Sequence, residues 1–147
     1  MSREDLLQYI RPMVMTNESP HPEVKAPRLG LAGGEGGWGK VDFRMSWWAI
    51  SEPFEMISEP HCHDFDQFIL FVGGDTTNMK DLGGEVELSL GPDPEHMEKF
   101  TFTEATAVYV PAGLYHAPLN FKKINDPSKP ILFHDLFFAP EYSRKQA

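Results

Sequence analysis

Short segments of alternating or continuous apolar character recur along the chain from residue 41 onward. In residues 41–50, apolar side chains at positions 41, 43, 45 and 47 alternate with a mostly polar set, which is the period of a strand with two different faces. Similar segments occupy residues 65–72, 85–90, 99–103, 106–110 and 131–138. Gly, Pro and Asp separate them, so the pattern predicts an all-β sandwich or barrel.

The first forty residues have a different character. Residues 3–10 are compatible with a short helix, because Ser2 can cap its N-terminus, acids occupy its first turn and Pro12 closes the segment. Residues 12–39 are rich in proline and glycine and predict an extended arm and loop. We therefore expect one unit, with an N-terminal helix and arm over residues 1–40 and a barrel over residues 41–147.

Charge and length restrict the classes of partner. The 147 residues include 22 acidic and 13 basic side chains, for a formal charge of −9, which argues against a nucleic-acid backbone and against an anionic membrane surface. A single cysteine excludes an internal disulfide, and no apolar signal core or membrane-length run is found. We expect a cytoplasmic protein that binds a small molecule.

The candidate chemical site contains three histidines. His61 and His63 are separated by one residue, so in an extended chain they project to the same side, and Gln67 shares their parity. His116 lies in a second segment, Pro-Ala-Gly-Leu-Tyr-His. Three neutral imidazoles and one amide oxygen can bind a divalent ion such as iron, zinc or nickel and leave room for water or substrate. Cys62 points to the opposite side and is expected to be a small buried hydrophobe.

The spacing of these residues resembles the two consensus motifs of the cupin superfamily. The first motif is matched by His61, His63, Gln67 and Gly73 or Gly74, and the second by Pro111, Gly113, His116 and Asn120. The chain departs from the motifs in having Gln67 where they have glutamate and in lacking the leading glycine of each. The resemblance implies a double-stranded β-helix, or jelly-roll barrel, and a homodimer in which the arm packs against a second subunit.

The resemblance also implies a metal centre held by His61, His63 and His116, with Gln67 as a weak fourth ligand. Because glutamine is neutral, the ion keeps its full charge and is a stronger Lewis acid toward a chelating anion. We favour Fe(II), since cupins with three histidines and no glutamate ligand include dioxygenases, and therefore expect a dioxygenase for a small chelating organic acid or carbonyl compound.

Two other functions stay open. Zinc, nickel or manganese would support an isomerase or lyase acting on a sugar-like or hydroxy-acid substrate, and a cupin barrel can also be a non-enzymatic binding or sensor module. No catalytic general base is assigned from the sequence. That absence favours oxygen activation over proton transfer, because proton transfer needs a base with a pKa near neutrality.

Four further residues are candidates for the substrate pocket. Arg44 lies on a predicted strand and either faces solvent or pairs with a carboxylate. Trp48 can line the cavity, Tyr109 lies near the motifs in sequence, and His134 is a polar residue in an apolar strand pattern. Asp135, its neighbour, is expected to face the other way.

Two further features of the sequence are not assigned a function. Residues 34–39 match the dinucleotide pattern G-x-G-x-x-G, but they precede a strand pattern and not a helix, so nucleotide binding is rejected. His21, which lies between two prolines in the arm, and His96, in an acidic turn, are expected to be exposed to solvent.

Overall fold

The computed structural model describes the chain except for residues 17–20, 26–27, 35–37, 140–142 and 146–147. One short helix is followed by ten strands in this part of the chain. They are α1 (Arg3–Leu7), β1 (Val14–Thr16), β2 (Arg28–Ala32), β3 (Arg44–Ile50), β4 (Phe54–Ile57), β5 (Gln67–Gly73), β6 (Asp81–Gly91), β7 (Glu98–Glu104), β8 (Thr106–Val110), β9 (Tyr115–Ile124) and β10 (Ile131–Phe137).

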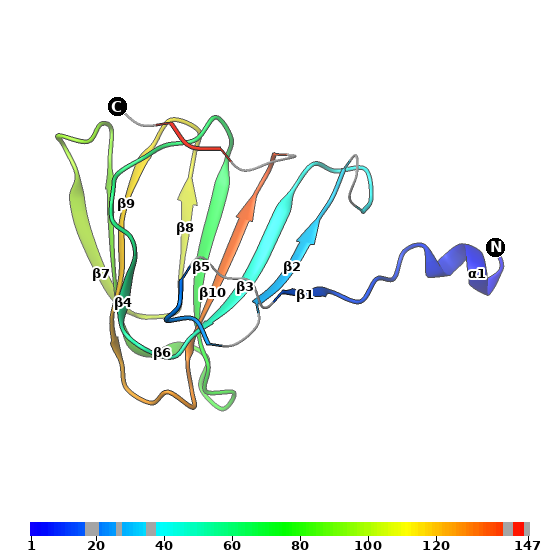
Figure 1. The fold of residues 1–147 in the computed structure, drawn as a ribbon, viewed down its shortest axis with the longest axis horizontal. Helices are drawn as coiled ribbons and strands as arrows, with labels where there is room; N and C mark the ends of the chain where they lie inside the picture. The colour runs from blue at the N-terminus through cyan, green and yellow to red at the C-terminus, as the bar shows by residue number, and fades with distance from the viewer. Residues whose placement is uncertain (17–20, 26–27, 35–37, 140–142, 146–147) are drawn as a thin grey trace.

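The strands form two antiparallel sheets. The larger has the order β1-β2-β3-β10-β5-β8, and the smaller has the order β4-β9-β6-β7. Figure 1 shows the two sheets side by side around a common interior, with α1 standing away from them. Because strands distant in sequence, such as β3 and β10, are paired, the topology is that of a jelly roll, and the predicted all-β class is confirmed.

The N-terminal region contributes more to the sheet than the sequence indicates. Residues 28–32, predicted as arm and loop, form β2, which pairs with β3 and with β1. A strand this short carries too few alternating positions to be recognised by its pattern. The Ser2 hydroxyl accepts a hydrogen bond from the Asp5 backbone at 3.2 Å, and the helix ends at Leu7. None of the described helical structure is long and apolar enough to cross a membrane.

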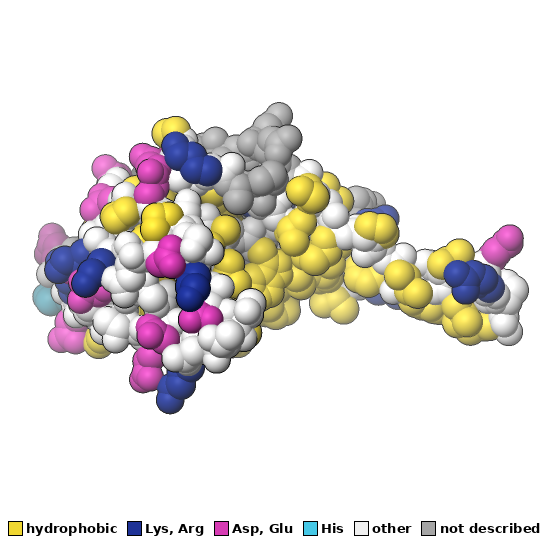
Figure 2. All heavy atoms as spheres, turned by 90° about the horizontal axis from the view of Figure 1, so that it is seen from below, with side chains coloured by type: hydrophobic (Ala, Val, Ile, Leu, Met, Phe, Trp, Pro, Cys, Tyr) yellow, Lys and Arg dark blue, Asp and Glu magenta, His cyan; other side chains and the backbone are white. Residues whose placement is uncertain are grey.

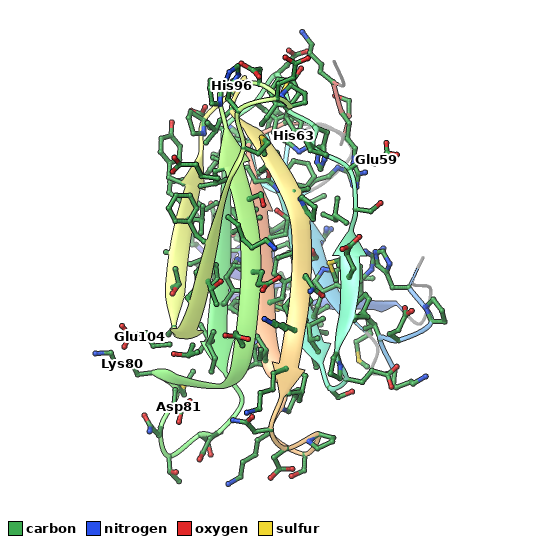
Figure 3. All side chains as sticks on the ribbon, turned by 90° about the vertical axis from the view of Figure 1, so that its left-hand side faces the viewer. Glu59, His63, Lys80, Asp81, His96 and Glu104 are labelled. Carbon is green, nitrogen blue, oxygen red and sulfur yellow. The ribbon has the colours of Figure 1, made fainter. Side chains whose placement is uncertain are left out.

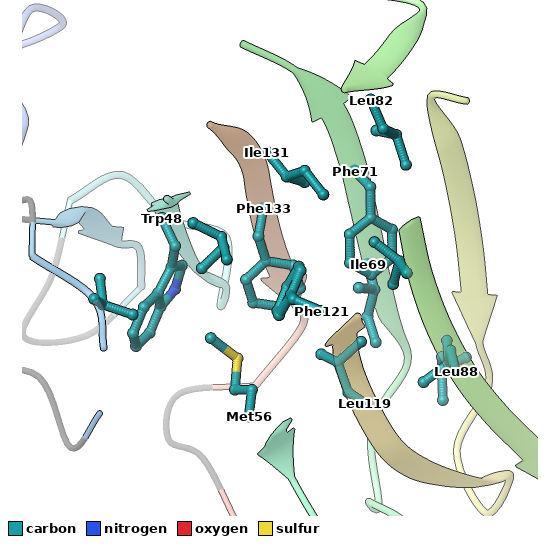
Figure 4. Close-up of a cluster of buried hydrophobic side chains, with 14 residues drawn as sticks. Trp48, Met56, Ile69, Phe71, Leu82, Leu88, Leu119, Phe121, Ile131 and Phe133 are labelled. Carbon is teal, nitrogen blue, oxygen red and sulfur yellow. The ribbon is translucent and has the colours of Figure 1, made fainter. Parts of the chain in front are cut away.

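A continuous apolar core fills the space between the sheets. Figure 4 shows Trp48 and Met56 at one side of it and Leu82 and Leu88 at the other. Its buried members are Val24, Trp48, Ile50, Met56, Ile69, Phe71, Leu82, Val86, Leu88, Val110, Leu119, Phe121, Ile131 and Phe133. They come from both sheets, so burying them fixes the two sheets against each other.

The register of the large sheet places its inward-facing side chains in rows. Side chains two residues apart on a strand share a face, and their counterparts on paired strands lie beside them. Across β5, β10 and β3, three successive rows are Gln67, Phe137 and Arg44; Ile69, Asp135 and Ser46; and Phe71, Phe133 and Trp48. Polar residues thus occupy the interior toward one end of the barrel, and the apolar core begins with the third row.

Candidate metal centre

Three buried histidines meet at one end of the barrel. His61 and His63 lie in the segment between β4 and β5, and His116 is the second residue of β9. One ring nitrogen from each lies within 4.8 Å of the other two. His63 is found near the top of Figure 3, at the end opposite Lys80 and Glu104. This confirms that the two sequence motifs come together as a three-histidine cluster.

Backbone hydrogen bonds join the two motifs. His61 and His116 exchange a pair of them, with N–O distances of 3.1 and 2.9 Å, and the Gly113 N–H donates to the His63 carbonyl at 2.9 Å. Gly113 adopts a φ of 89°, in the left-handed region where a side chain would be strained. The Asp66 carboxylate accepts from the Ala112 N–H at 3.0 Å. The main chain therefore fixes the positions of the histidines independently of any ligand.

Each imidazole is oriented through its Nδ1 atom. His61 Nδ1 lies 3.2 Å from the Glu59 carbonyl, His116 Nδ1 lies 3.1 Å from the Leu114 carbonyl, and His63 Nδ1 bonds the Ser143 carbonyl. A carbonyl only accepts, so each Nδ1 carries the proton and each Nε2 has a lone pair. The Nε2 atom of His61 is buried and has no hydrogen-bond partner among the described residues. This arrangement suits metal coordination.

The environment keeps these imidazoles neutral. Burial lowers the pKa of His116 to about 3 and that of His61 to about 4, and it also lowers the pKa of His63. The Arg144 guanidinium lowers all three further. Neutral imidazole is the form that ligates metals, so the cluster is ready to bind an ion at neutral pH.

A fourth polar group, Gln67, adjoins the cluster. Its Nε2 donates to Asp135 Oδ1 at 2.6 Å, while its Oε1 is buried and makes no hydrogen bond to any described residue. Burial raises the pKa of Asp135 to about 6, although the hydrogen bond from Gln67 acts in the opposite direction. Asp135 faces the opposite side of β10 from His134, as expected, but Asp135 and not His134 lines the cavity.

A cavity of about 600 Å³ opens beside the histidines, which is within the usual size range of small-molecule pockets. Its wall includes His61, His116 and Gln67. The other lining residues, mostly apolar, are Val14, His21, Arg28, Gly30, Leu31, Ala32, Arg44, Met45, Ser46, Trp48, Met56, Ile57, Ile69, Leu119, Phe133, Asp135, Phe137 and Arg144.

The four predicted pocket residues divide into two pairs. Arg44 and Trp48 line the cavity, whereas His134 and Tyr109 do not. His134 faces the other side of β10, where its ring stacks on Trp47 at 3.9 Å and its Nδ1 bonds the Ser46 carbonyl at 2.9 Å. The Tyr109 side chain is half exposed and packs on Phe68. These placements correct the expectation that His134 and Tyr109 line the pocket.

Three polar lining residues come from outside the strands that the sequence predicts. His21, expected to be exposed, packs its ring 5.6 Å from Phe54 and 6.1 Å from Trp48. The Arg28 guanidinium lies 4.6 Å from the centre of the Trp48 ring, and Arg144 comes from the segment after β10. None of the three lies in a periodic segment, so only their identity as polar residues in irregular regions could have suggested them.

Comparison with known proteins identifies the fold. No family model matches the sequence, and none of the curated proteins matches it. A structure of oxalate decarboxylase, a cupin studied for its substrate binding mode, matches with a TM-score of 0.52 at 16% identity over 82% of this chain. A structure of the Bacillus subtilis oxalate decarboxylase, studied for its Mn(II) centres, matches with a TM-score of 0.51 at 15% identity over 82% of this chain. The chain has a cupin fold.

The likeness is one of fold, and the chain spans 27% of the length of each of these decarboxylase chains. Within the cupin barrel, the residues present fit a divalent metal. Three neutral nitrogen donors converge, and the Nε2 of His61 is buried with no hydrogen-bond partner in the part of the chain that the structure describes. This donor set suits zinc, iron, nickel and copper.

Proposed function

We propose that this cupin is a mononuclear metal-dependent enzyme acting on a small chelating organic acid or carbonyl compound. The observation that supports it is the convergence of His61, His63 and His116 beside the cavity. A purely structural site would be closed by a fourth protein ligand. Here Gln67 Oε1 is the proposed weak fourth donor, and the cavity provides space for a substrate.

In this proposal the histidines and the cavity wall have different roles. The three imidazoles would hold the ion through Nε2, and their carbonyl partners fix the direction of each ring. A divalent ion held only by neutral donors supplies an undiminished positive charge that polarises a chelating anion. The mostly apolar lining of the cavity would strengthen electrostatic interactions inside it.

The first candidate reaction is an Fe(II)-dependent dioxygenase. Its support is the set of three histidines without a carboxylate ligand, which is similar to that of the cupin dioxygenases. In this reaction the chain positions the substrate, and no side chain needs to shuttle a proton at the reacting carbon.

The second candidate is a lyase or isomerase that uses zinc, nickel or manganese. The observation that favours it is Asp135, the one carboxylate among the described residues that line the cavity. The sequence-based preference for oxygen chemistry rested on the lack of a candidate base. Asp135 removes that reason, because it lines the same cavity as His61 and His116 and lies beside Gln67.

Metal content and oxygen dependence separate these candidates. Protein purified without added metals or chelators, and kept from air, should carry close to one equivalent of metal by elemental mass spectrometry. Turnover of β-dicarbonyls and hydroxy acids is then compared with and without oxygen. Iron with strict oxygen dependence supports the dioxygenase, and oxygen-independent turnover supports the lyase or isomerase. Protein that cannot be loaded with any metal would contradict both and favour a binding module.

We also propose that the protein is a homodimer in which the N-terminal arm packs on a second copy. The arm carries exposed apolar side chains, with Ile10 70% and Met15 65% exposed, and Figure 2 shows hydrophobic side chains along it. Isolated apolar residues are common on surfaces, whereas a series of them suggests an interface. Light scattering coupled to size-exclusion chromatography should give twice the chain mass, and Ile10→Asp should halve it. A wild-type monomer at micromolar concentration would refute the proposal.

A further inference from the structure

The outer side of the large sheet is apolar across four neighbouring strands. On β3, β10, β5 and β8, the side chains that alternate with the inward rows point away from the core. The strand register arranges them in three rows, which are Trp47, His134, Leu70 and Ala107; Leu136, Phe68 and Tyr109; and Ala49, Leu132 and Val72. None of them is Asp, Glu, Lys or Arg. We refer to these residues as the apolar face.

The small sheet has the composition that is usual for a sheet in contact with water. On its outer side Glu87 pairs with Lys99 of β7 at 3.8 Å and with Lys122 of β9 at 3.2 Å. An antiparallel sheet with one side in water commonly places polar side chains on that side. The apolar face lacks them, although Phe68 and Tyr109 are 37% and 51% exposed. Aromatic side chains without charged neighbours are typical of the centre of a protein interface.

The N-terminal arm contains a helix that lacks packing of its own. α1 has five residues, and none of them is buried, whereas isolated helices this short are not stable in water. Trp38 Nε1 donates to the Gln8 carbonyl at 3.0 Å, and Figure 1 shows α1 pointing away from both sheets. The apolar side chains of Tyr9, Ile10 and Val14, which follow the helix, are 58%, 70% and 60% exposed. The packing that this segment needs therefore comes from another molecule.

A second copy of the chain would cover both surfaces at once. In a two-fold symmetric dimer each copy presents the same surfaces to the other, so both arms and both apolar faces are buried together. Each copy carries a formal charge of −9, and such molecules repel each other unless they meet through uncharged surfaces. The apolar face and the exposed apolar residues of the arm together approach the roughly 20 to 30 residues that each partner contributes to a stable interface.

We propose that the apolar face is the surface on which the N-terminal arm of a second copy docks. The inference rests on the homodimer proposed above and assigns the surface that receives the arm. It also connects the interface to the pocket, because Val14 belongs to the exposed arm and lines the cavity. Docking of the arm would therefore fix one side of the cavity wall.

Matched phenylalanine variants of the full chain test this assignment. Phe68→Lys introduces a charge on the apolar face, and Phe100→Lys introduces one on β7 of the small sheet, where Phe100 is 47% exposed. Their masses are measured by light scattering coupled to size-exclusion chromatography. We expect Phe68→Lys to have the mass of one chain and Phe100→Lys to keep twice that mass. A dimeric Phe68→Lys protein would overturn the assignment.

Hydroxyl-radical footprinting tests the same surface without altering it, which matters if Phe68→Lys does not fold. Labelling of Phe68, Tyr109 and Phe100 is measured by mass spectrometry in the wild-type protein and in Ile10→Asp. Phe68 and Tyr109 should be labelled several-fold more in Ile10→Asp, because the arm of the second copy no longer covers them, while Phe100 should not change. Equal labelling of Phe68 in the two proteins would overturn the assignment.

The two measurements keep this inference apart from the homodimer itself. A monomeric wild-type protein refutes both. A dimer that Ile10→Asp separates without any change in the labelling of the apolar face keeps the dimer and refutes this docking surface. A monomeric Phe68→Lys protein together with a dimeric Ile10→Asp protein would mean that two copies meet through the apolar face without the arm, which refutes the role of the arm.

Discussion

Gln67 on β5 and Asp135 on β10 are diagonal neighbours across two paired strands, and the Gln67 Nε2 donates to Asp135 Oδ1 at 2.6 Å. The opposite orientation of the amide would place two acceptor oxygens against each other. The carboxylate therefore determines that Gln67 directs its Oε1 away from β10. Asp135 acts on the histidine end of the pocket in this way even when it does not touch a substrate.

Replacing Asp135 by asparagine tests whether its carboxylate takes part in the reaction. Asparagine retains an acceptor for Gln67 but cannot take up a proton from a substrate. Turnover that needs no oxygen should fall about 10²- to 10⁴-fold, the range for loss of a general base, whereas oxygen-dependent turnover should fall far less. Metal content, measured on the same samples, should be unchanged. An unaltered oxygen-independent rate would contradict the role of Asp135 in the lyase or isomerase candidate.

The histidine cluster predicts the effect of removing one ring. His116→Ala should reduce metal loading from close to one equivalent to close to zero, because the two remaining imidazoles and an amide oxygen form a weak site. His96→Ala is the control, since His96 lies in an exposed turn beside Asp93 and should leave loading intact. Elemental mass spectrometry gives both values, and full loading of His116→Ala would disprove the ligand assignment.

Acid should destabilise the protein in part through His134. Burial lowers the pKa of its imidazole in the folded state, so the unfolded chain binds the proton more readily as the pH falls below about 6.5. The free energy of unfolding therefore decreases from pH 7.5 to pH 5.5. His134→Gln can still donate to the Ser46 carbonyl and cannot become charged, so its decrease over this range should be smaller. Urea unfolding at both pH values measures the difference, and identical decreases would exclude this contribution.

The core predicts a large effect at Phe121. Its side chain is fully buried, and its ring packs against those of Phe54, Phe71 and Phe133. Phe121→Ala removes these contacts and should lower the free energy of unfolding by about 3–5 kcal/mol. Phe100, on β7, is 47% exposed, and Phe100→Ala should cost less than about 1 kcal/mol. Denaturant unfolding of the metal-free variants would show a similar loss for both if Phe121 were not a core residue.

The histidine cluster could be predicted because its information is local. His61 and His63 are two residues apart, and Pro111, Gly113 and His116 have the spacing of a second motif. The resemblance of both segments to the cupin motifs implied that they share one site. The last strand lacked such a signal. Each face of this strand carries one polar residue, Asp135 or His134, among apolar ones. The pattern therefore does not show which face is inward, and a shift of one residue exchanges the faces. That is why His134 was predicted to line the pocket and Asp135 was not.

Other parts of the pocket depend on contacts that have no sequence pattern. His21 and Arg28 come from the N-terminal region, which forms pocket wall only because β2 pairs with β3. Arg144 follows the last strand and reaches the histidines only in the folded chain. The resemblance to cupins covers the barrel motifs and not these segments, so their contribution to the cavity wall could not be inferred from it.

The Ser143 carbonyl that orients His63 lies 80 residues after it in the chain. In order of synthesis, the whole barrel is therefore made before the acceptor for this ring exists. The neighbouring Lys145 pairs with Cys62 through two backbone hydrogen bonds, so the same segment also covers the main chain between two of the histidines. A fusion partner or purification tag attached directly after this segment would therefore lie close to the three-histidine cluster, whereas one attached before α1 would lie away from the sheets.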